Sequence, residues 1–196
     1  MLPKLPTVTD QKNKTQSPQK SRSRILAKTN TLSIEVLEML GVADRAQIIA
    51  LSETLEVQYG THAKWTENTV QRYFNFPATK PIVARLFGKI IGFIIGVPLE
   101  NFAQEFWAKG DSNLHQHNTA YTYTFVVGQK YRGKGYAATL KTVYLNQMKK
   151  LGYDYVSGHV LDGVARQFSK TAVVIRKYKN WQSTGKTFEY YRRPLN

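Results

Sequence analysis

Several segments of the chain alternate apolar and polar residues with the two-residue period of a β-strand. The clearest covers residues 118–127, where two tyrosines and Phe125 share one face while two threonines and Val126 share the other. Residues 81–97 predict two further strands joined by a hairpin at Gly88. Similar β-rich runs predict strands over residues 32–40, 153–161 and 187–195.

Between these strands, apolar residues recur every three or four positions, which is typical of amphipathic helices. Asp44 is placed to cap the first helix, and Gly152 follows the third at a position that favours a helix end. The predicted helices cover residues 45–60, 66–76, 137–151 and 165–175. Strands come first and then alternate with helices, so we predict one α/β domain of the α+β kind over residues 31–196.

The N-terminal segment shows neither pattern. Residues 1–28 contain three prolines and many lysines, glutamines and serines, so they offer little apolar surface to bury. We predict a disordered basic tail over residues 1–30. Because it supplies no predicted strand or helix, we expect it to be dispensable for the chemistry of the domain.

The net charge of +15 is unevenly distributed. Residues 129–196 carry 14 Lys and Arg against three acids, whereas residues 31–128 carry seven against nine. This asymmetry predicts an anionic ligand for the C-terminal part. The aromatic residues are not interleaved with the basic ones as a base-stacking surface would require, which argues against a nucleic-acid partner.

The composition excludes several other classes of site. The chain has no cysteine, which rules out disulfides, a cysteine nucleophile and thiolate metal sites. His115 and His117 form an H-x-H with no third ligand nearby, so we expect no metal. The longest apolar run, residues 90–99, is far too short to cross a bilayer. We expect a cytoplasmic protein with no membrane partner.

One loop, GQKYRGKGYA at residues 128–137, fits three phosphate-binding patterns. A P-loop needs Ser or Thr after its lysine to hold magnesium, but Gly135 occupies that position. A dinucleotide-binding loop lies near the start of its sheet, but about 130 residues precede this one. The third pattern, R-x-x-G-x-A beginning at Arg132, is the one that suits a loop between a strand and a helix.

The loop has the chemistry of a pyrophosphate cradle. Its glycines allow successive backbone N–H groups to converge, and the following helix adds its positive N-terminus. Gly133 and Gly135 keep Cβ atoms away from phosphate oxygens, and Lys130, Arg132 and Lys134 add charge.

At these residues the sequence resembles the GNAT N-acetyltransferase superfamily. The resemblance covers residues 31–196 and includes YRGKGYA, YDYVSGHV and NWQSTGKTFEYY. It implies a mixed, mostly antiparallel sheet flanked by helices and splayed open between the strands at residues 119–127 and 153–161. Acetyl-CoA, the implied co-substrate, would lie in the splay.

The resemblance also implies which residues contact acetyl-CoA. The backbone of the strand before the loop would pair with the pantetheine arm, and the loop would hold the pyrophosphate. Ser169 stands where the family often has a CoA-contacting asparagine, and Arg176 stands where many members have a tyrosine that protonates the CoA thiolate. The implied contacts are Phe125, Val126, Val127, Arg132, Gly133, Lys134, Gly135, Tyr136, Ala137, Ser169 and Arg176.

The catalytic side chains depart from the family pattern. Tyr121 replaces the glutamate base of histone-type members, and a tyrosine, with a usual pKa of about 10, is a poor base. Tyr178 lies two residues beyond the position of the family's tyrosine acid, about 200° around a helix, so it is no simple substitute. Glu100, Tyr123 and His159 are other candidate bases. A chain of water molecules is an equal alternative.

We therefore expect an enzyme, an N-acetyltransferase that moves an acetyl group from acetyl-CoA to a primary amine by direct attack. The amine would belong to a protein lysine, a protein N-terminus or a small molecule. No covalent intermediate is expected, because the chain lacks cysteine and a nucleophile-elbow serine. The nine acids of residues 31–128 favour a cationic acceptor. The alternative is a non-catalytic acyl-CoA-binding regulatory module.

Overall fold

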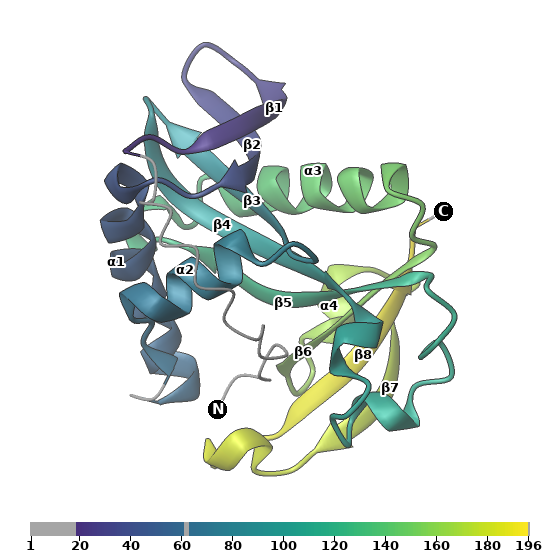
Figure 1. The fold of residues 1–196 in the computed structure, drawn as a ribbon. Coiled ribbons are helices and arrows are strands. Elements are labelled where there is room, and N and C mark those ends of the chain that lie inside the picture. Colours follow the sequence, from purple (N-terminus) through teal and green to yellow (C-terminus); the bar gives the residue numbers. More distant parts are fainter. Residues whose placement is uncertain (1–18, 61–62, 196) are drawn as a thin grey trace, which may run out of the picture.

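The computed structural model describes residues 19–60 and 63–195. Within these residues the chain forms one open sheet in the order β1-β2-β3-β4-β5-β6-β8-β7 (Figure 1). Neighbouring strands are antiparallel except β5 and β6, which are parallel. The strands are β1 (Arg22–Lys28), β2 (Leu32–Met39), β3 (Lys80–Leu86), β4 (Lys89–Pro98), β5 (Thr119–Val127), β6 (Tyr155–Leu161), β7 (Val173–Tyr178) and β8 (Phe188–Pro194). The predicted mixed, mostly antiparallel sheet is confirmed.

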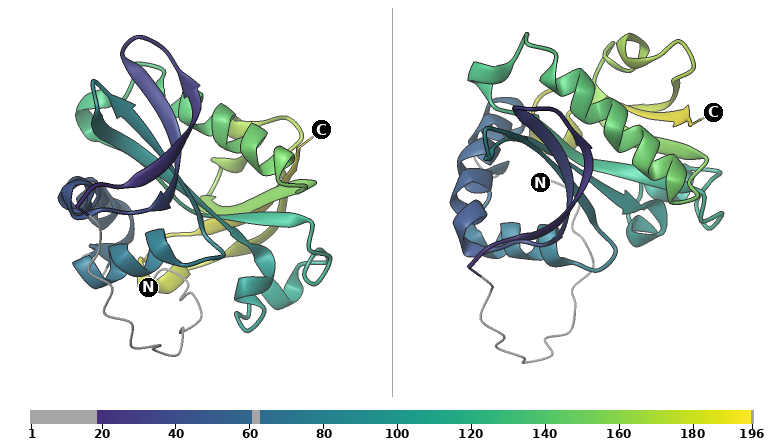
Figure 2. Two further views of the ribbon diagram at one scale, coloured as in Figure 1. Left: turned by 45° about the horizontal axis from the view of Figure 1, so that its top comes forward. Right: turned by 90° about the horizontal axis from the view of Figure 1, so that it is seen from above.

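Helices cover both faces of this sheet (Figure 2). On one face lie α1 (Val42–Tyr59) and α2 (Glu67–Asn75), and on the other lies α3 (Tyr136–Lys150). The remaining helical segments are α4 (Ala165–Phe168) and the 3₁₀ turns η2 (Leu99–Phe102), η3 (Ala108–Gly110), η4 (Gln129–Tyr131) and η5 (Trp181–Ser183). In the described ranges, no helix combines the length and the apolar character needed to cross a membrane.

Two apolar clusters fill the two faces, because successive strand residues point to opposite sides of a sheet. On the α1/α2 face, the rings of Trp65, Phe74 and Phe93 pack with centroids 5.3 to 6.3 Å apart. On the other face, Leu140 and Met148 of α3 are fully buried against the strands. Both faces are thus covered, so a ligand site has to form where strands separate.

The strands separate between β5 and β6. Residues 119–121 pair with residues 155–157, and no further pairs form between the two strands. Beyond this junction β5 continues along β4, while β6 continues along β8. The sheet is therefore splayed at the position that the resemblance implied.

The first strand corrects the prediction of a disordered tail over residues 1–30. β1 pairs with β2, although most of its side chains are exposed. Its backbone hydrogen bonds hold this edge strand in place of apolar side chains, which explains why the hydrophobic pattern did not reveal it. Residues 1–18 lie outside the described residues, so a disordered tail there stays a prediction.

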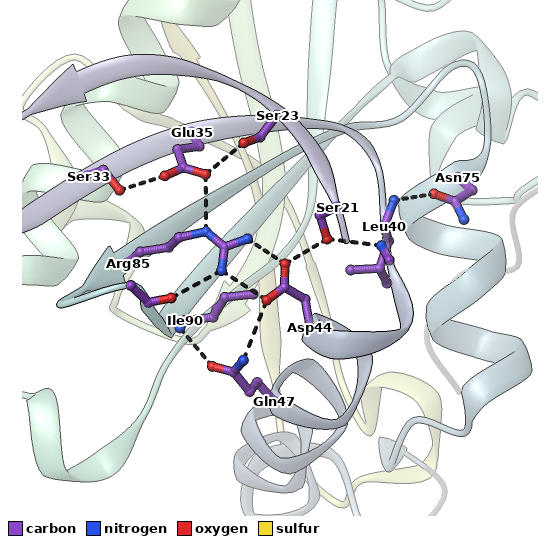
Figure 3. A network of polar contacts seen from close by, with 12 residues as sticks. Ser21, Ser23, Ser33, Glu35, Leu40, Asp44, Gln47, Asn75, Arg85 and Ile90 are labelled. Carbon is purple, nitrogen blue, oxygen red and sulfur yellow. Dashed lines mark hydrogen bonds and ion pairs between the residues drawn. The ribbon is translucent and has the colours of Figure 1, made fainter. Parts of the chain in front are cut away.

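Arg85 of β3 ties the N-terminal hairpin to α1 (Figure 3). Its guanidinium lies 2.5 Å from a carboxylate oxygen of Asp44 and 3.1 Å from one of Glu35. Ser21 donates to Asp44 at 2.6 Å, and Ser23 donates to Glu35 at 2.8 Å. Partial burial opposes ionisation, but these hydrogen bonds and the Arg85 charge lower the pKa of both carboxyls. Asp44 lies in the first turn of α1 and does not cap it, contrary to the prediction.

The segment after α4 also differs from the prediction. The expected helix through Ile175 is wrong, because α4 ends at Phe168 and β7 pairs with β8. Three consecutive β-branched residues, 173–175, suit a strand better than a helix. Arg176 and Tyr178 therefore share one side of a strand, with the guanidinium carbon 6.0 Å from the ring centroid. The separation of about 200° expected on a helix is therefore absent on β7.

Candidate active site

A cleft opens where β5 and β6 separate. Its lining comes from β5, β6, β8, α1 and α3, and it includes residues from both apolar clusters. Tyr59 of α1 reaches Phe188 of β8, with ring centroids 5.4 Å apart. The cleft therefore passes between the two halves of the sheet, with α3 along one face and α1 along the other.

The edge of β5 presents backbone groups to this cleft. Residues 122–125 line it, and beyond residue 121 this edge has no partner strand in the described part of the chain. Thr122 pairs with Gly96 and Thr124 with Ile95, so Tyr123 is an extra, bulged residue. A bulge re-aims the backbone groups next to it, and an extended ligand with amide groups can pair with such an edge as an added strand.

The three predicted pantetheine contacts on β5 differ in position. Phe125 lines the cleft, whereas Val126 and Val127 are buried beyond it, near the end of the strand. Thr124 is a contact that the sequence did not single out. Its Oγ1 is buried and has no hydrogen-bond partner among the described residues.

The loop after β5 has the backbone that an anion cradle needs. Gly133 and Gly135 have φ of 72° and 82°, in the left-handed region that favours glycine. Gly135 is the N-cap of α3, and within the described chain no side chain caps this helix. The first-turn N–H groups, including those of Tyr136 and Ala137, are thus left for a ligand.

The loop side chains add charge around this backbone. Arg132 and Lys134 are both exposed, and Arg132 Nε donates to the Val127 carbonyl at 3.4 Å. A Cβ at Gly133 or Gly135 would meet no protein atom within 4 Å. Within the protein alone, the requirement for glycine is therefore the backbone conformation.

At the fork of the cleft, Tyr121 of β5 and His159 of β6 are joined. Tyr121 Oη lies 2.9 Å from His159 Nδ1. His159 lines the cleft, and its Nε2 is buried with no hydrogen-bond partner among the described residues. Two of the predicted catalytic candidates, 38 residues apart in sequence, thus form one polar pair.

The Acetyltransferase (GNAT) family matches residues 48–166, which contain β5, the glycine loop, α3 and β6. The chain belongs to the GNAT acetyltransferase family. Members of this family use acetyl-CoA, which agrees with the cradle and the splayed strands. A comparison with curated protein sequences finds no match.

Solved GNAT structures share the fold of this chain at low identity. An acetyltransferase of the GNAT family from Streptococcus pneumoniae is 13% identical, with a TM-score of 0.61 over 84% of this chain and 99% of the other. The ribosomal-protein-S18-alanine N-acetyltransferase from Escherichia coli is 13% identical, with a TM-score of 0.60 over 84% and 94%. A chimera of the spermidine N-acetyltransferase SpeG from Vibrio cholerae and hSSAT is 16% identical, with a TM-score of 0.60 over 85% and 96%. These likenesses establish the fold.

The surroundings of the polar pair fix its protonation. Burial lowers the pKa of His159 to about 3, so the imidazole is neutral at physiological pH. Trp181 stacks on it with ring centroids 4.0 Å apart, and Tyr190 packs at 4.9 Å. Burial first, and then neighbouring tyrosines and Glu105, raise the pKa of Tyr121 well above its usual value. Tyr121 thus keeps its proton and cannot serve as the base itself.

The other three catalytic candidates are not part of this pair. Tyr123 lines the cleft, but burial raises its pKa, as it does for Tyr121. Tyr178 packs against the His159 ring at 5.6 Å from outside the cleft. Glu100 accepts a hydrogen bond from the His117 backbone N–H at 2.9 Å and does not line the cleft.

Two predicted CoA contacts after β6 also lie outside the cleft. Ser169 follows α4, and its Oγ lies 2.8 Å from Thr171 Oγ1. Arg176 lines a separate hollow with Phe106 and Trp181. Both positions were inferred from a helix that the structure replaces with β7, so the correspondence with family positions is lost.

Lys141 of α3 is a functional candidate that the sequence analysis missed. It is half-buried and lines the cleft, and burial, followed by the nearby Arg193 charge, lowers its pKa to about 8. Its position in the sequence already indicated burial. Lys141 lies four residues after Ala137 and three before Tyr144, in line with the apolar stripe of the helix.

Six of the nine acids of residues 31–128 already face a Lys or Arg. The pairs are Glu35–Arg85, Glu38–Arg22, Asp44–Arg85, Glu53–Lys64, Glu67–Arg45 and Asp111–Arg192. Within the described residues, Glu56 and Glu105 form no ion pair. The acidic field expected on the acceptor side is therefore weaker than the residue count suggested, and Glu105, near Tyr121, is its best-placed member.

Proposed function

We propose that this GNAT protein is an N-acetyltransferase that moves an acetyl group from acetyl-CoA to a primary amine by direct attack. The observation that carries the proposal is the order of features along β5. Its open edge starts at the Tyr121–His159 pair at the fork, and the strand then continues into the glycine loop and the uncapped start of α3.

The glycine loop, the edge of β5 and the fork match successive parts of acetyl-CoA. The N–H groups of the loop and of the first turn of α3 would hold the pyrophosphate, with charge from Arg132 and Lys134. The edge of β5 would pair with the pantetheine amides, and the orphan Thr124 Oγ1 would gain a partner. When bound, acetyl-CoA supplies the acetyl group as an activated thioester.

His159 Nε2 would accept a hydrogen bond from the attacking amine and orient it, while the proton released by the amine would pass to water, because burial lowers the pKa of His159 to about 3. In the tautomer that leaves Nε2 bare, Nδ1–H donates to Tyr121 Oη, and Nε2 can accept. Tyr121 then acts as a positioning residue that holds the ring in this tautomer. A β5 N–H group at the bulge would stabilise the negative charge that develops on the thioester carbonyl oxygen of acetyl-CoA.

The acceptor would enter from the α1/α2 face, because Tyr121 belongs to the apolar cluster on that face and His159 packs against two of its members. Among similar structures, one enzyme acts on a ribosomal-protein alanine and another on spermidine, so protein and small-amine acceptors both suit this fold. The negative charge of Glu105, which helps to raise the pKa of Tyr121, supports a cationic amine.

Thermal unfolding with CoA and acetyl-CoA, followed by an assay of thiol release with peptide and polyamine acceptors, tests this function. Both ligands should stabilise the protein, by about 2.7 kcal/mol at 100 times the dissociation constant. Thiol release should require both acetyl-CoA and an amine. Stabilisation without thiol release across amine classes would favour the regulatory module, and no stabilisation by either ligand would exclude both functions.

A further inference from the structure

The cleft has different ionisable groups on its two faces. On the α1/α2 face lies the neutral His159, and on the α3 face lies the cationic Lys141. We infer that Lys141 is the general acid of the reaction, giving a proton to the CoA sulfur as it leaves. This assignment rests on the proposed acetyl transfer.

The alternation of the strands sets this two-faced arrangement. Thr122 of β5 points to α3, where its Oγ1 lies 3.0 Å from Tyr144 Oη, while the adjacent Tyr121 points to His159. Gly158 and His159 of β6 alternate in the same way, since Gly158 lies against Thr122. Lys141, one turn before Tyr144 on α3, therefore lines the face of the cleft opposite to His159.

The step balances with Lys141 and water. As the amine nitrogen bonds to the acetyl carbon, the carbon–sulfur bond breaks and its electron pair stays on sulfur. A proton from Lys141 Nζ neutralises that sulfur, and the proton of the amine passes to water while the neutral His159 Nε2 orients the amine. Lys141 ends neutral and regains its proton from water.

The other groups on the α3 face are poorer acids. Burial raises the pKa of Tyr144 strongly and that of Tyr191 to about 12, and a guanidinium such as that of Arg193 does not release its proton. Lys141 has been brought close to the usual pKa of a thiol, about 8.5, which favours proton transfer between them. The ionisable groups that share the cleft with it are Arg193, Tyr191, Tyr144, Tyr123, Tyr59 and His159.

The position that the family pattern suggested for this role does not serve it. Arg176 is on the edge strand β7 and lines another hollow. The short α4 brings no tyrosine to the cleft within the described residues. The role of an acid from the helix after β6 would thus pass to a lysine of α3 that lines the cleft.

Three variants test the inference, with wild type measured in parallel. Lys141→Met removes the charge and the proton, Lys141→Arg keeps the charge but cannot release a proton, and Lys149→Met is a control at the exposed end of the same helix. With an amine acceptor, we expect kcat to fall about 100-fold in both Lys141 variants while KM for acetyl-CoA changes less than about threefold. The wild-type kcat should decline above about pH 8, and this decline should disappear in the arginine variant.

A second measurement does not depend on turnover. The ultraviolet absorbance of the thiolate, titrated with pH, gives the pKa of bound CoA, and Lys141→Met should raise that pKa by at least about one unit because it removes a neighbouring cation. Full kcat in the Lys141→Arg variant would overturn the inference, because charge alone would then suffice. A Lys141→Met variant that loses CoA affinity but keeps kcat would also overturn it. If Lys141→Met does not fold, Lys141→Gln takes its place. Wild type that binds no CoA or releases no thiol would instead reject the proposed function.

Discussion

Tyr121 Oη lies 2.9 Å from His159 Nδ1, and the two residues belong to strands that part immediately beyond them. The hydrogen bond spans the fork of the sheet and fixes the imidazole plane at the inner end of the cleft. Because burial keeps Tyr121 protonated and His159 neutral, the pair is held in one charge state across physiological pH. The remaining variable is the tautomer of His159, which decides what Nε2 can accept.

His159→Gln should lower kcat about tenfold, because it disturbs the hydrogen-bond acceptor that orients the attacking amine. Tyr121→Phe should lower it less, because it removes only the hydroxyl that orients the ring. The dissociation constant of CoA, measured by calorimetry, should stay within about threefold in both. Tyr155→Phe, which removes a hydroxyl from β6 outside the cleft, serves as the control. Unchanged kcat in His159→Gln would show that His159 Nε2 does not orient the amine.

His159 should also make the protein less stable in acid. Its folded-state pKa of about 3 lies below the usual value of about 6.5, so only the unfolded chain binds this proton between those pH values. Stability is therefore lost as pH falls below about 6.5. Between pH 7 and pH 5 the loss from this group is about 2 kcal/mol. Urea unfolding at pH 7 and pH 5 should show a smaller decrease in the free energy of unfolding for His159→Gln than for wild type. An equal decrease in both proteins would mean that the imidazole is solvated.

Gly135→Val should weaken CoA binding about tenfold or more, because a β-branched residue does not readily adopt φ of 82° at the start of α3. Gly152→Val is a matched control, since Gly152 has φ of 88° and is equally open, but lies at the far end of the helix. Both variants should have melting temperatures lowered by a similar amount relative to wild type. CoA affinity measured at a temperature where both are folded should fall in Gly135→Val alone.

Removal of residues 1–28 should destabilise the protein, whereas removal of residues 1–18 should not. The longer deletion takes away β1 and the hydrogen bonds from Ser21 and Ser23 to Asp44 and Glu35. With several hydrogen bonds lost at about 1 kcal/mol each, we expect a decrease of about 2 to 4 kcal/mol in the free energy of unfolding. Equal denaturation midpoints for the two truncations would show that β1 contributes nothing to the fold.

The acceptor preference should depend on Glu105. If its charge favours a cationic amine, Glu105→Gln should lower kcat/KM for a polyamine several-fold while leaving a neutral amine nearly unaffected. Added salt should reduce the preference in wild type. Glu53→Gln, which changes an exposed acid paired with Lys64, is the control. A polyamine preference that persists in Glu105→Gln would assign the selection to the shape of the pocket.

Local sequence patterns predicted the parts of the fold that local forces determine. The hairpin of β3 and β4, the strand β5 and the start of α3 each have a strong apolar period or a glycine whose conformation is needed. β1 could not be predicted in this way, because pairing with β2 holds it and its own apolar contacts are few. β7 was misassigned because an apolar spacing of three and four residues also occurs by chance in β-branched segments.

The candidate site was predictable where it consists of backbone and not where it consists of side-chain contacts. The loop from Gly128 to Ala137 lies after β5 as expected, since its spacing alone defines it. The contact between Tyr121 and His159 depends on the fork of the sheet, which brings together residues from separate strands. Lys141 was overlooked because its burial depends on β8, which follows it by about 50 residues.

The short junction between β5 and β6 divides the sheet into two plates, β1 to β5 and β6 to β8, joined by a seam of three residue pairs. Any change in the angle between the plates changes the width of the cleft. A ligand that bonds along the edge of β5 extends the seam beyond the fork and resists such movement. Release of the product then has to break this added seam, so the rate of turnover depends on how tightly the plates are coupled as well as on the chemistry at the fork.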